Sequence, residues 1–125
     1  MSKRVPYDDA YATCERTFAE LRIYTGDISP DYVTHILGIH PTHIVRVGEI
    51  ITNSSGRQRV GRVNGWFLSS EGNSNSLDLR RHLDWLLPQL NENISALRQL
   101  QDLEEIKMSI VCIWWSKSNT GGPTL

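Results

Sequence analysis

Histidines are the side chains in this sequence whose types and spacing come nearest to a metal site. His35, His40 and His43 lie close together, and Glu49 follows. Imidazole and carboxylate groups are ordinary ligands of zinc. The spacing argues against a shared ion, however, because His35 falls on an expected helix while the other two flank Pro41 in a turn. We therefore expect turn or surface histidines, and no metal.

Nucleophilic catalysis needs a serine or cysteine on a strained turn with a base in reach. Ser69 and Ser70 follow an expected strand, but no Gly-x-Ser-x-Gly frame surrounds them. Cys112 lies in an apolar strand, where burial raises the pKa of a thiol and weakens it as a nucleophile. His82 stands beside core positions of a helix and is interpreted as a packed or capping residue. The sequence predicts no catalytic residue and no cofactor, and a small hydrolase is the least favoured function.

Positive charge is concentrated in one glycine-flanked segment, at Arg57, Arg59 and Arg62. Guanidinium groups bind phosphate and carboxylate groups. This segment is therefore a candidate binding site for a nucleotide, a nucleic acid or an acidic protein surface. Nothing aromatic alternates with the arginines, as a platform for a single nucleic-acid strand requires, and a net charge of -1 gives no general attraction to nucleic acid. A solvated hairpin tip is favoured, with nucleotide or nucleic-acid binding as the alternative.

Trp85 and Trp115 are candidate binding residues of another kind. Large aromatic side chains mostly fill cores, but they also dominate the energetics of protein interfaces. Trp85 stands beside the leucine face of an expected helix, and Trp115 ends the most apolar stretch of the chain. If both side chains face solvent, they mark a contact surface.

That apolar stretch, Ile106–Trp115, is the element around which we expect the fold to be built. In an extended strand, successive side chains point to opposite faces. One face would carry Ile106, Met108, Ile110, Cys112 and Trp114, and the other Val111, Ile113 and Trp115. Both faces are apolar, which is typical of a strand inside a sheet with cover on each side.

Local patterns predict the other elements. Alternation predicts a strand at 18–24, and the 43–52 stretch reads as a second strand with a bulge at Gly48. A long hairpin loop at 53–61 joins it to a third strand at 62–70. Ser29 and Gly38 bound a short helix. A long helix capped by Ser76 is expected to kink near Leu87, because Pro88 removes a hydrogen bond, and to resume at 94–103.

This order predicts an α+β two-layer sandwich with a mainly antiparallel sheet, helices on one face and roughly ferredoxin-like connectivity. Residues 1–17 are expected to be a flexible N-terminal segment, and 18–125 a single domain. The long helix should pack its leucines on the final strand, at the face that carries Ile110 and Cys112. The leucines concerned are Leu83, Leu86, Leu87 and Leu90.

Composition favours an ordinary globular protein, with 39% hydrophobic and 22% charged residues. The chain lacks a secretory apolar region and any run of about 18 apolar residues, so neither export nor a membrane span is expected. The two cysteines, Cys14 and Cys112, have no metal-type spacing and are expected to be free thiols. We therefore expect a cytoplasmic protein.

Several of these segments resemble a bacterial family of domains of unknown function, number four-two-seven-nine. The resemblance runs from about Phe18 onward and rests on Leu21-Arg22-Ile23-Tyr24, Ile28-Ser29-Pro30-Asp31, Leu37-Gly38-Ile39, Arg46-Val47-Gly48-Glu49, Trp66-Phe67-Leu68-Ser69-Ser70 and Gly121-Gly122-Pro123-Thr124-Leu125. It implies no activity. Relatives are expected to continue past the glycine-proline turn into another helix and strand, and to carry a bulkier aromatic residue near Ile44 and Val45.

Without a catalytic motif, the sequence favours a non-enzymatic bacterial protein that binds another protein, plausibly an immunity-type or defence-linked module. In ferredoxin-like connectivity the final strand is an edge, and its second apolar face needs a cover. We therefore expect a partner protein or a homo-dimer through Ile106–Trp115, rather than a working monomer. The alternative is that residues 1–17 fold back as the cover.

Overall fold

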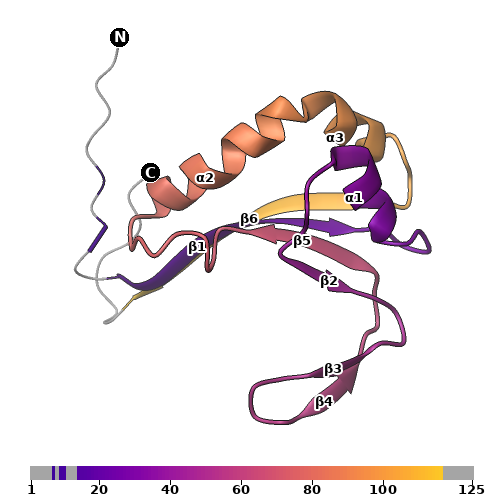
Figure 1. Ribbon diagram of the computed structural model, residues 1–125, viewed down its shortest axis with the longest axis horizontal. Helices are drawn as coiled ribbons and strands as arrows, with labels where there is room; N and C mark the ends of the chain where they lie inside the picture. Colours follow the sequence, from indigo (N-terminus) through magenta and orange to yellow (C-terminus); the bar gives the residue numbers. More distant parts are fainter. Residues whose placement is uncertain (1–6, 8, 11–13, 117–125) are drawn as a thin grey trace.

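The computed structural model describes Tyr7, Asp9, Ala10 and residues 14–116 (Figure 1). Its elements follow the order strand, helix, four strands, two helices and strand. They are β1 (Cys14–Tyr24), α1 (Asp31–Leu37), β2 (His43–Val45), β3 (Ile50–Thr52), β4 (Gln58–Val60), β5 (Gly65–Ser69), α2 (Leu79–Glu92), α3 (Ile94–Gln101) and β6 (Lys107–Ser116). None of the helices in this described part is long and apolar enough to cross a membrane.

Four strands form one antiparallel sheet in the order β2-β5-β1-β6, and β3 and β4 pair separately as a small hairpin. Without that hairpin, the large sheet has the strand-helix-strand-strand-helix-strand connectivity of ferredoxin-like folds. Figure 1 shows the three helices on the same side of this sheet. The predicted α+β class with a mainly antiparallel sheet is confirmed.

The core lies between the helices and the middle of the sheet. Ala19, Leu21 and Ile23 of β1 face the helices and are almost fully buried, together with Trp66 and Leu68 of β5. Their side chains share one face because Leu21 lies opposite Leu68 and Ile23 lies opposite Trp66 in the antiparallel register. The central strands are therefore β1 and β5. The apolar stretch forms the edge strand β6, as the predicted connectivity implied, although its two apolar faces had suggested a place inside the sheet.

Some described residues within positions 1–17 contact the rest of the fold. β1 begins at Cys14, ahead of the expected start at Phe18. Asp9 lies against the start of α2, where its carboxylate accepts a hydrogen bond from Arg81 Nε at 2.6 Å and its carbonyl accepts one from the backbone of Leu77 at 2.8 Å. The hydrogen bond from Arg81 lowers the pKa of Asp9. Within the segment considered as a cover for β6, Asp9 contacts the start of α2, whereas Arg16 lies opposite Trp115 of β6 and places its guanidinium over that ring.

The predicted strand at 43–52 divides into β2 and β3. Gly48 has a φ of 83°, which side-chain-bearing residues rarely adopt, and the Glu49 N–H donates to the Arg46 carbonyl at 3.1 Å, closing a turn. β3 then leaves the large sheet and pairs with β4, which lies inside the predicted loop. We call residues 46–63 the arm. Figure 1 shows it extending from the side of the sheet opposite the helices.

The long helix also differs from the expectation. α2 runs unbroken through Pro88, which lies on the exposed side where water can take the place of the missing N–H. The break comes at Asn93, between α2 and α3. The N-cap is Asp78, whose carboxylate accepts from Arg80 N at 3.0 Å, whereas Ser76 Oγ accepts from the Asp78 N–H at 3.0 Å.

The prediction that α2 packs on β6 is wrong, because α2 packs mainly on β1. Leu86 and Leu90 are buried and Leu83 is partly buried, but Leu87 is 44% exposed and Ile110 is 47% exposed. Cys112 is exposed as well. α2 rests on β1, since β1 forms the middle of the sheet. The outer side of the helix therefore lies above the edge strand but leaves apolar side chains of both elements exposed.

Replacement of the two neighbouring leucines of α2 tests this arrangement. Leu86→Ala should lower the free energy of unfolding by about 2 to 5 kcal/mol, because it leaves a cavity in a closed core. Leu87→Ala should cost less than about 1 kcal/mol, because its side chain is already half in water. Urea unfolding followed by tryptophan fluorescence measures both. Equal losses for the two variants would contradict the observed orientation of α2.

Candidate functional site

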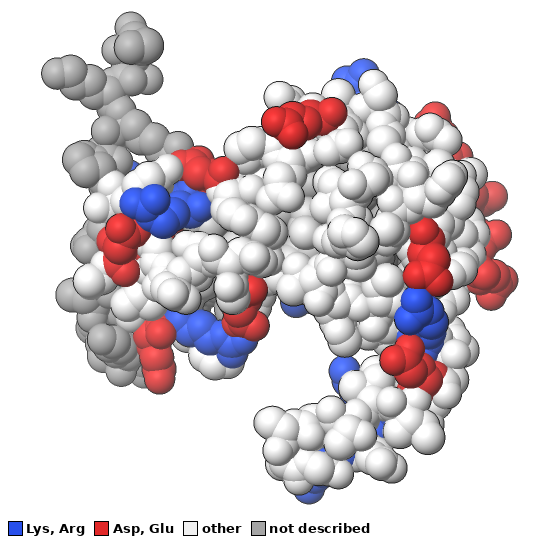
Figure 2. Space-filling view, in the orientation of Figure 1, with Lys and Arg blue, Asp and Glu red and all other residues white. Residues whose placement is uncertain are grey.

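A cleft of about 820 Å³ separates the arm from the face of the sheet that carries no helix. Figure 2 shows this hollow between the body of the molecule and the arm. Its lining comes from β1, β2 and β5 on one side and from the arm on the other. The lining residues are Tyr24, Val45, Ile51, Gln58, Arg59, Val60, Gly61, Arg62, Val63 and Phe67.

The root of the arm is held by close backbone contacts. Gly61 donates to the Glu49 carbonyl at 2.7 Å, and its own carbonyl accepts from Gly48 N at 2.9 Å. A Cβ on Gly61 would lie 2.2 Å from the carbonyl oxygen of Arg46, so only glycine fits there. Asn64 adds a clamp: its side chain accepts from Val47 N at 3.0 Å and donates to the Gly26 carbonyl at 2.8 Å. The arm is therefore fixed at its root.

The floor of the cleft is aromatic. Phe67 folds over Gly65, where an added Cβ would meet the Phe67 ring at 2.7 Å. The ring of His43 lies beside it at 5.8 Å between centroids and 27° between planes, and Tyr24 stands edge-on at 5.9 Å and 83°. Phe67 is thus laid against the sheet, with Tyr24 as a side wall.

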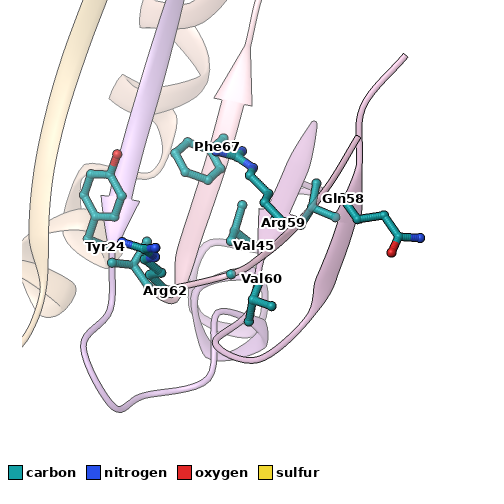
Figure 3. Close-up of a pocket in the computed structure, with 10 residues that line it drawn as sticks. Tyr24, Val45, Gln58, Arg59, Val60, Arg62 and Phe67 are labelled. Carbon is teal, nitrogen blue, oxygen red and sulfur yellow. The ribbon is translucent and has the colours of Figure 1, made fainter. Parts of the chain in front are cut away.

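Two of the three predicted arginines reach this cleft. Arg59 and Arg62 line it, and Figure 3 shows Arg59 extending from the arm toward Phe67 and Arg62 lying near Tyr24. Arg57 lines a smaller neighbouring cavity of about 300 Å³, which it shares with Arg59. The aromatic residues of the cleft were not predicted, because Tyr24 and Phe67 lie on strands outside the arginine-rich segment.

These arginines differ from most others in the protein in having no acidic partner among the described residues. Five other arginines form ion pairs with carboxylates, in the pairs Arg16–Glu71, Arg22–Glu20, Arg46–Asp31, Arg80–Asp78 and Arg81–Asp9. The hydrogen bond from Arg46 also lowers the pKa of Asp31. The charge in the cleft therefore remains available to a ligand.

A second surface lies on the helix side of the sheet, between α2, α3 and the edge of β6. Two adjoining cavities of about 670 and 270 Å³ share Leu90, Ile94, Leu97 and Ile110. Leu87, Ile94 and Ile110 remain 44 to 47% exposed beside them. We call this surface the edge groove. It is mainly apolar, in contrast to the cationic cleft.

The two predicted tryptophans do not share a surface. Trp115 is 52% exposed on the helix-free face, where the Arg16 guanidinium lies 4.7 Å from its ring centre. Trp85 is on α2, partly buried against the core. Of the two, only Trp115 is exposed enough to contact a partner. Its role in binding stays a prediction.

The residues considered for catalysis are separated or sealed. Ser70 Oγ lies 2.6 Å from His82 Nδ1, and His82 Nε2 donates to the Ser76 carbonyl at 2.6 Å. Ser70 and His82 are at most 1% exposed, and the Ser70 hydroxyl also accepts from the Ala19 N–H at 2.9 Å. This pair therefore fastens the start of α2 to the end of β5, with no access for a substrate in the observed structure.

The histidines proposed as a group lie on separate elements: His35 on α1, His43 on β2 and His40 in the loop between them. In the described part of the chain no three His, Cys, Asp or Glu side chains are grouped so as to hold a metal ion. Although Cys112 is exposed as a residue, partial desolvation raises the pKa of its thiol, which disfavours the thiolate needed for attack.

Comparison with known protein families gives a match. The model of a family described as a domain of unknown function, DUF4279, matches residues 14–125, which includes both surfaces described above. No curated protein and no solved structure matches the chain.

The glycine at the root of the arm provides a test of how the cleft is formed. Gly61→Ala should break the paired hydrogen bonds between positions 48, 49 and 61, because its Cβ would collide with the Arg46 carbonyl. Hydrogen exchange measured by NMR should then speed up for the Gly48 amide and for β3 and β4, while amides of β1 stay protected. Val63→Ala, at an exposed position of the arm, is the control. Unchanged exchange in Gly61→Ala would mean that this contact does not hold the arm.

Proposed function

The chain belongs to the DUF4279 family, and on that premise we propose that it acts without catalysis, by binding another protein at the edge groove. One observation carries this proposal. The strand that forms the edge, β6, runs directly beneath apolar side chains of α2 and α3 that nothing in the described structure covers. The family description assigns no activity, so the support comes from this surface.

Strand addition is the form of binding that suits such an edge. An edge strand presents backbone N–H and C=O groups to any extended chain that aligns with it. The added strand gains affinity from these main-chain hydrogen bonds and specificity from alternate side chains that enter neighbouring pockets. Here those side chains would enter the edge groove beside Leu87 and Ile94. Burying apolar surface there contributes roughly 25 cal/mol for each Å² removed from water.

The strand donor is a partner protein or a second copy of this chain. A second copy would pair its own β6 around a two-fold axis and extend the sheet across both molecules, burying Ile110 of each. An immunity role is a narrower form of the same proposal, in which the donor is a toxin. A toxin gene beside this one would support that form, and a neighbourhood of metabolic genes alone would count against it.

Placing charge in the edge groove tests the proposal. Ile94→Lys combined with Ile110→Lys should abolish association, because two solvated ammonium groups would have to lose water on docking. Both positions are about half exposed, so the fold should tolerate the change. Light scattering over a range of concentrations measures self-association, and titration calorimetry with the purified product of a neighbouring gene measures partner binding.

Val47→Lys combined with Val60→Lys is the matched control, because it adds the same charge at apolar positions of the arm that are 60% and 58% exposed. This control should leave association intact. A chain that stays monomeric at every concentration excludes the second copy as donor. If the edge variant and the arm control bind the partner equally well, docking at β6 is excluded too.

A further inference from the structure

The cleft under the arm is lined by arginine and aromatic side chains that have no part in the proposed strand addition at β6. We infer that it binds a nucleotide unit of a single-stranded nucleic acid, with the base on Phe67 and the phosphate on Arg59 and Arg62. The edge groove lies on the helix side of the sheet and this cleft on the other, so the two sites are independent. The argument rests on the floor, the charge and the shape of the cleft.

The floor suits a flat ring. Phe67 can lie against the sheet because Gly65 beneath it has no side chain, and the nearly parallel ring of His43 on β2 stacks with it from outside the cleft. Four-stranded sheets that bind single-stranded RNA stack bases on aromatic side chains in this way. Here the floor comes from β5 and the wall, Tyr24, from β1, and these are the two central strands of the sheet. Stacking tolerates any base, since every base has a π-face.

The charge suits a phosphate. Arg59 and Arg62 line the cleft without an acidic partner in the described structure, and none of the residues that line it is acidic. A guanidinium presents two parallel donors that match phosphate oxygens, and its flat surface also stacks on aromatic rings. Arg59 extends toward Phe67 (Figure 3), so a base could lie between the ring and the guanidinium.

The shape suits a strand rather than an enclosed metabolite. Figure 2 shows that the hollow between the arm and the body of the molecule is open to solvent. Along β1, the helix-free face continues with Arg22, Glu20, Phe18 and Arg16. Arg22 is paired with Glu20, Arg16 is paired with Glu71, and Phe18 is buried, so the free charge and the aromatic floor are confined to the cleft. The cleft therefore suits one unit of a longer strand.

The sequence argued against nucleic acid because no aromatic residue alternates with the arginines. In the folded chain the arm turns back over the sheet, so that two arginines of the arm and two aromatic residues of the central strands line one cavity. The alternation that such a platform requires is formed across strands instead of along one.

Fluorescence anisotropy with labelled poly(dT) and poly(U) strands tests the inference at low and rising salt. Arg62→Ala should weaken binding and lower the slope of log affinity against log salt by about 0.7, the contribution of one phosphate contact to a single strand. Phe67→Leu keeps an apolar residue on the sheet but removes the ring, and should weaken binding roughly 5- to 150-fold while leaving the salt slope unchanged.

Arg98→Ala is the matched control. It removes the same charge from an exposed arginine of α3, on the other side of the sheet, and should leave affinity and slope unchanged. Melting curves establish that each variant is folded, and both arginines are exposed, so their loss should not unfold the protein. Comparison of the two labelled strands shows whether the ligand is DNA or RNA.

Competition identifies the ligand class. An unlabelled poly(dT) strand should displace the label, whereas thymidine monophosphate should do so only at much higher concentration; equal competition by the monophosphate would assign the site to free nucleotides. Displacement by polyglutamate at the same charge concentration would assign it to acidic peptides and overturn the inference. So would the absence of binding at low salt, or an equal effect of Arg62→Ala and Arg98→Ala.

Discussion

The pairing of β1 with strands on both of its sides is the constraint on which the rest of the structure depends. β5 and β6 fix its two edges, so its helix-facing side chains Ala19, Leu21 and Ile23 form the centre of the core. α2 settles over that centre because the most apolar surface lies there. A helix centred on β1 reaches β6 with its outer side only, which leaves the edge groove open.

The same arrangement leaves two unfilled surfaces of different character. The edge groove is mainly apolar and borders backbone groups of β6, which favours an extended protein segment. The cleft combines a flat aromatic floor with two arginines that have no acidic partner among the described residues, which favours a ligand that carries both a ring and a negative charge. Because the sheet separates them, occupation of one surface need not obstruct the other.

Glycine makes the cleft possible at two places where a side chain would fill space. Gly61 lets the arm approach the Arg46 carbonyl, and Gly65 lets Phe67 lie against the sheet. Neither has a positive φ, so their role is to allow close approach rather than an unusual backbone conformation. The buried hydrogen bond between Ser70 and His82 has a structural role: although serine and histidine are common catalytic residues, here they join the end of β5 to α2.

The sequence by itself determined the α+β class, the order of the principal elements, the end of α1 at Gly38, which has a left-handed φ of 67°, and the candidate arginines. Those features follow from side-chain alternation, helical spacing and local backbone preference. Only the tertiary structure decided that β1 is central, that β3 leaves the sheet, and that Phe67 lines the same cleft as Arg59. Alternation tells which side chains share a face of a strand, but strand neighbours depend on contacts between residues far apart in the chain, which no local pattern records.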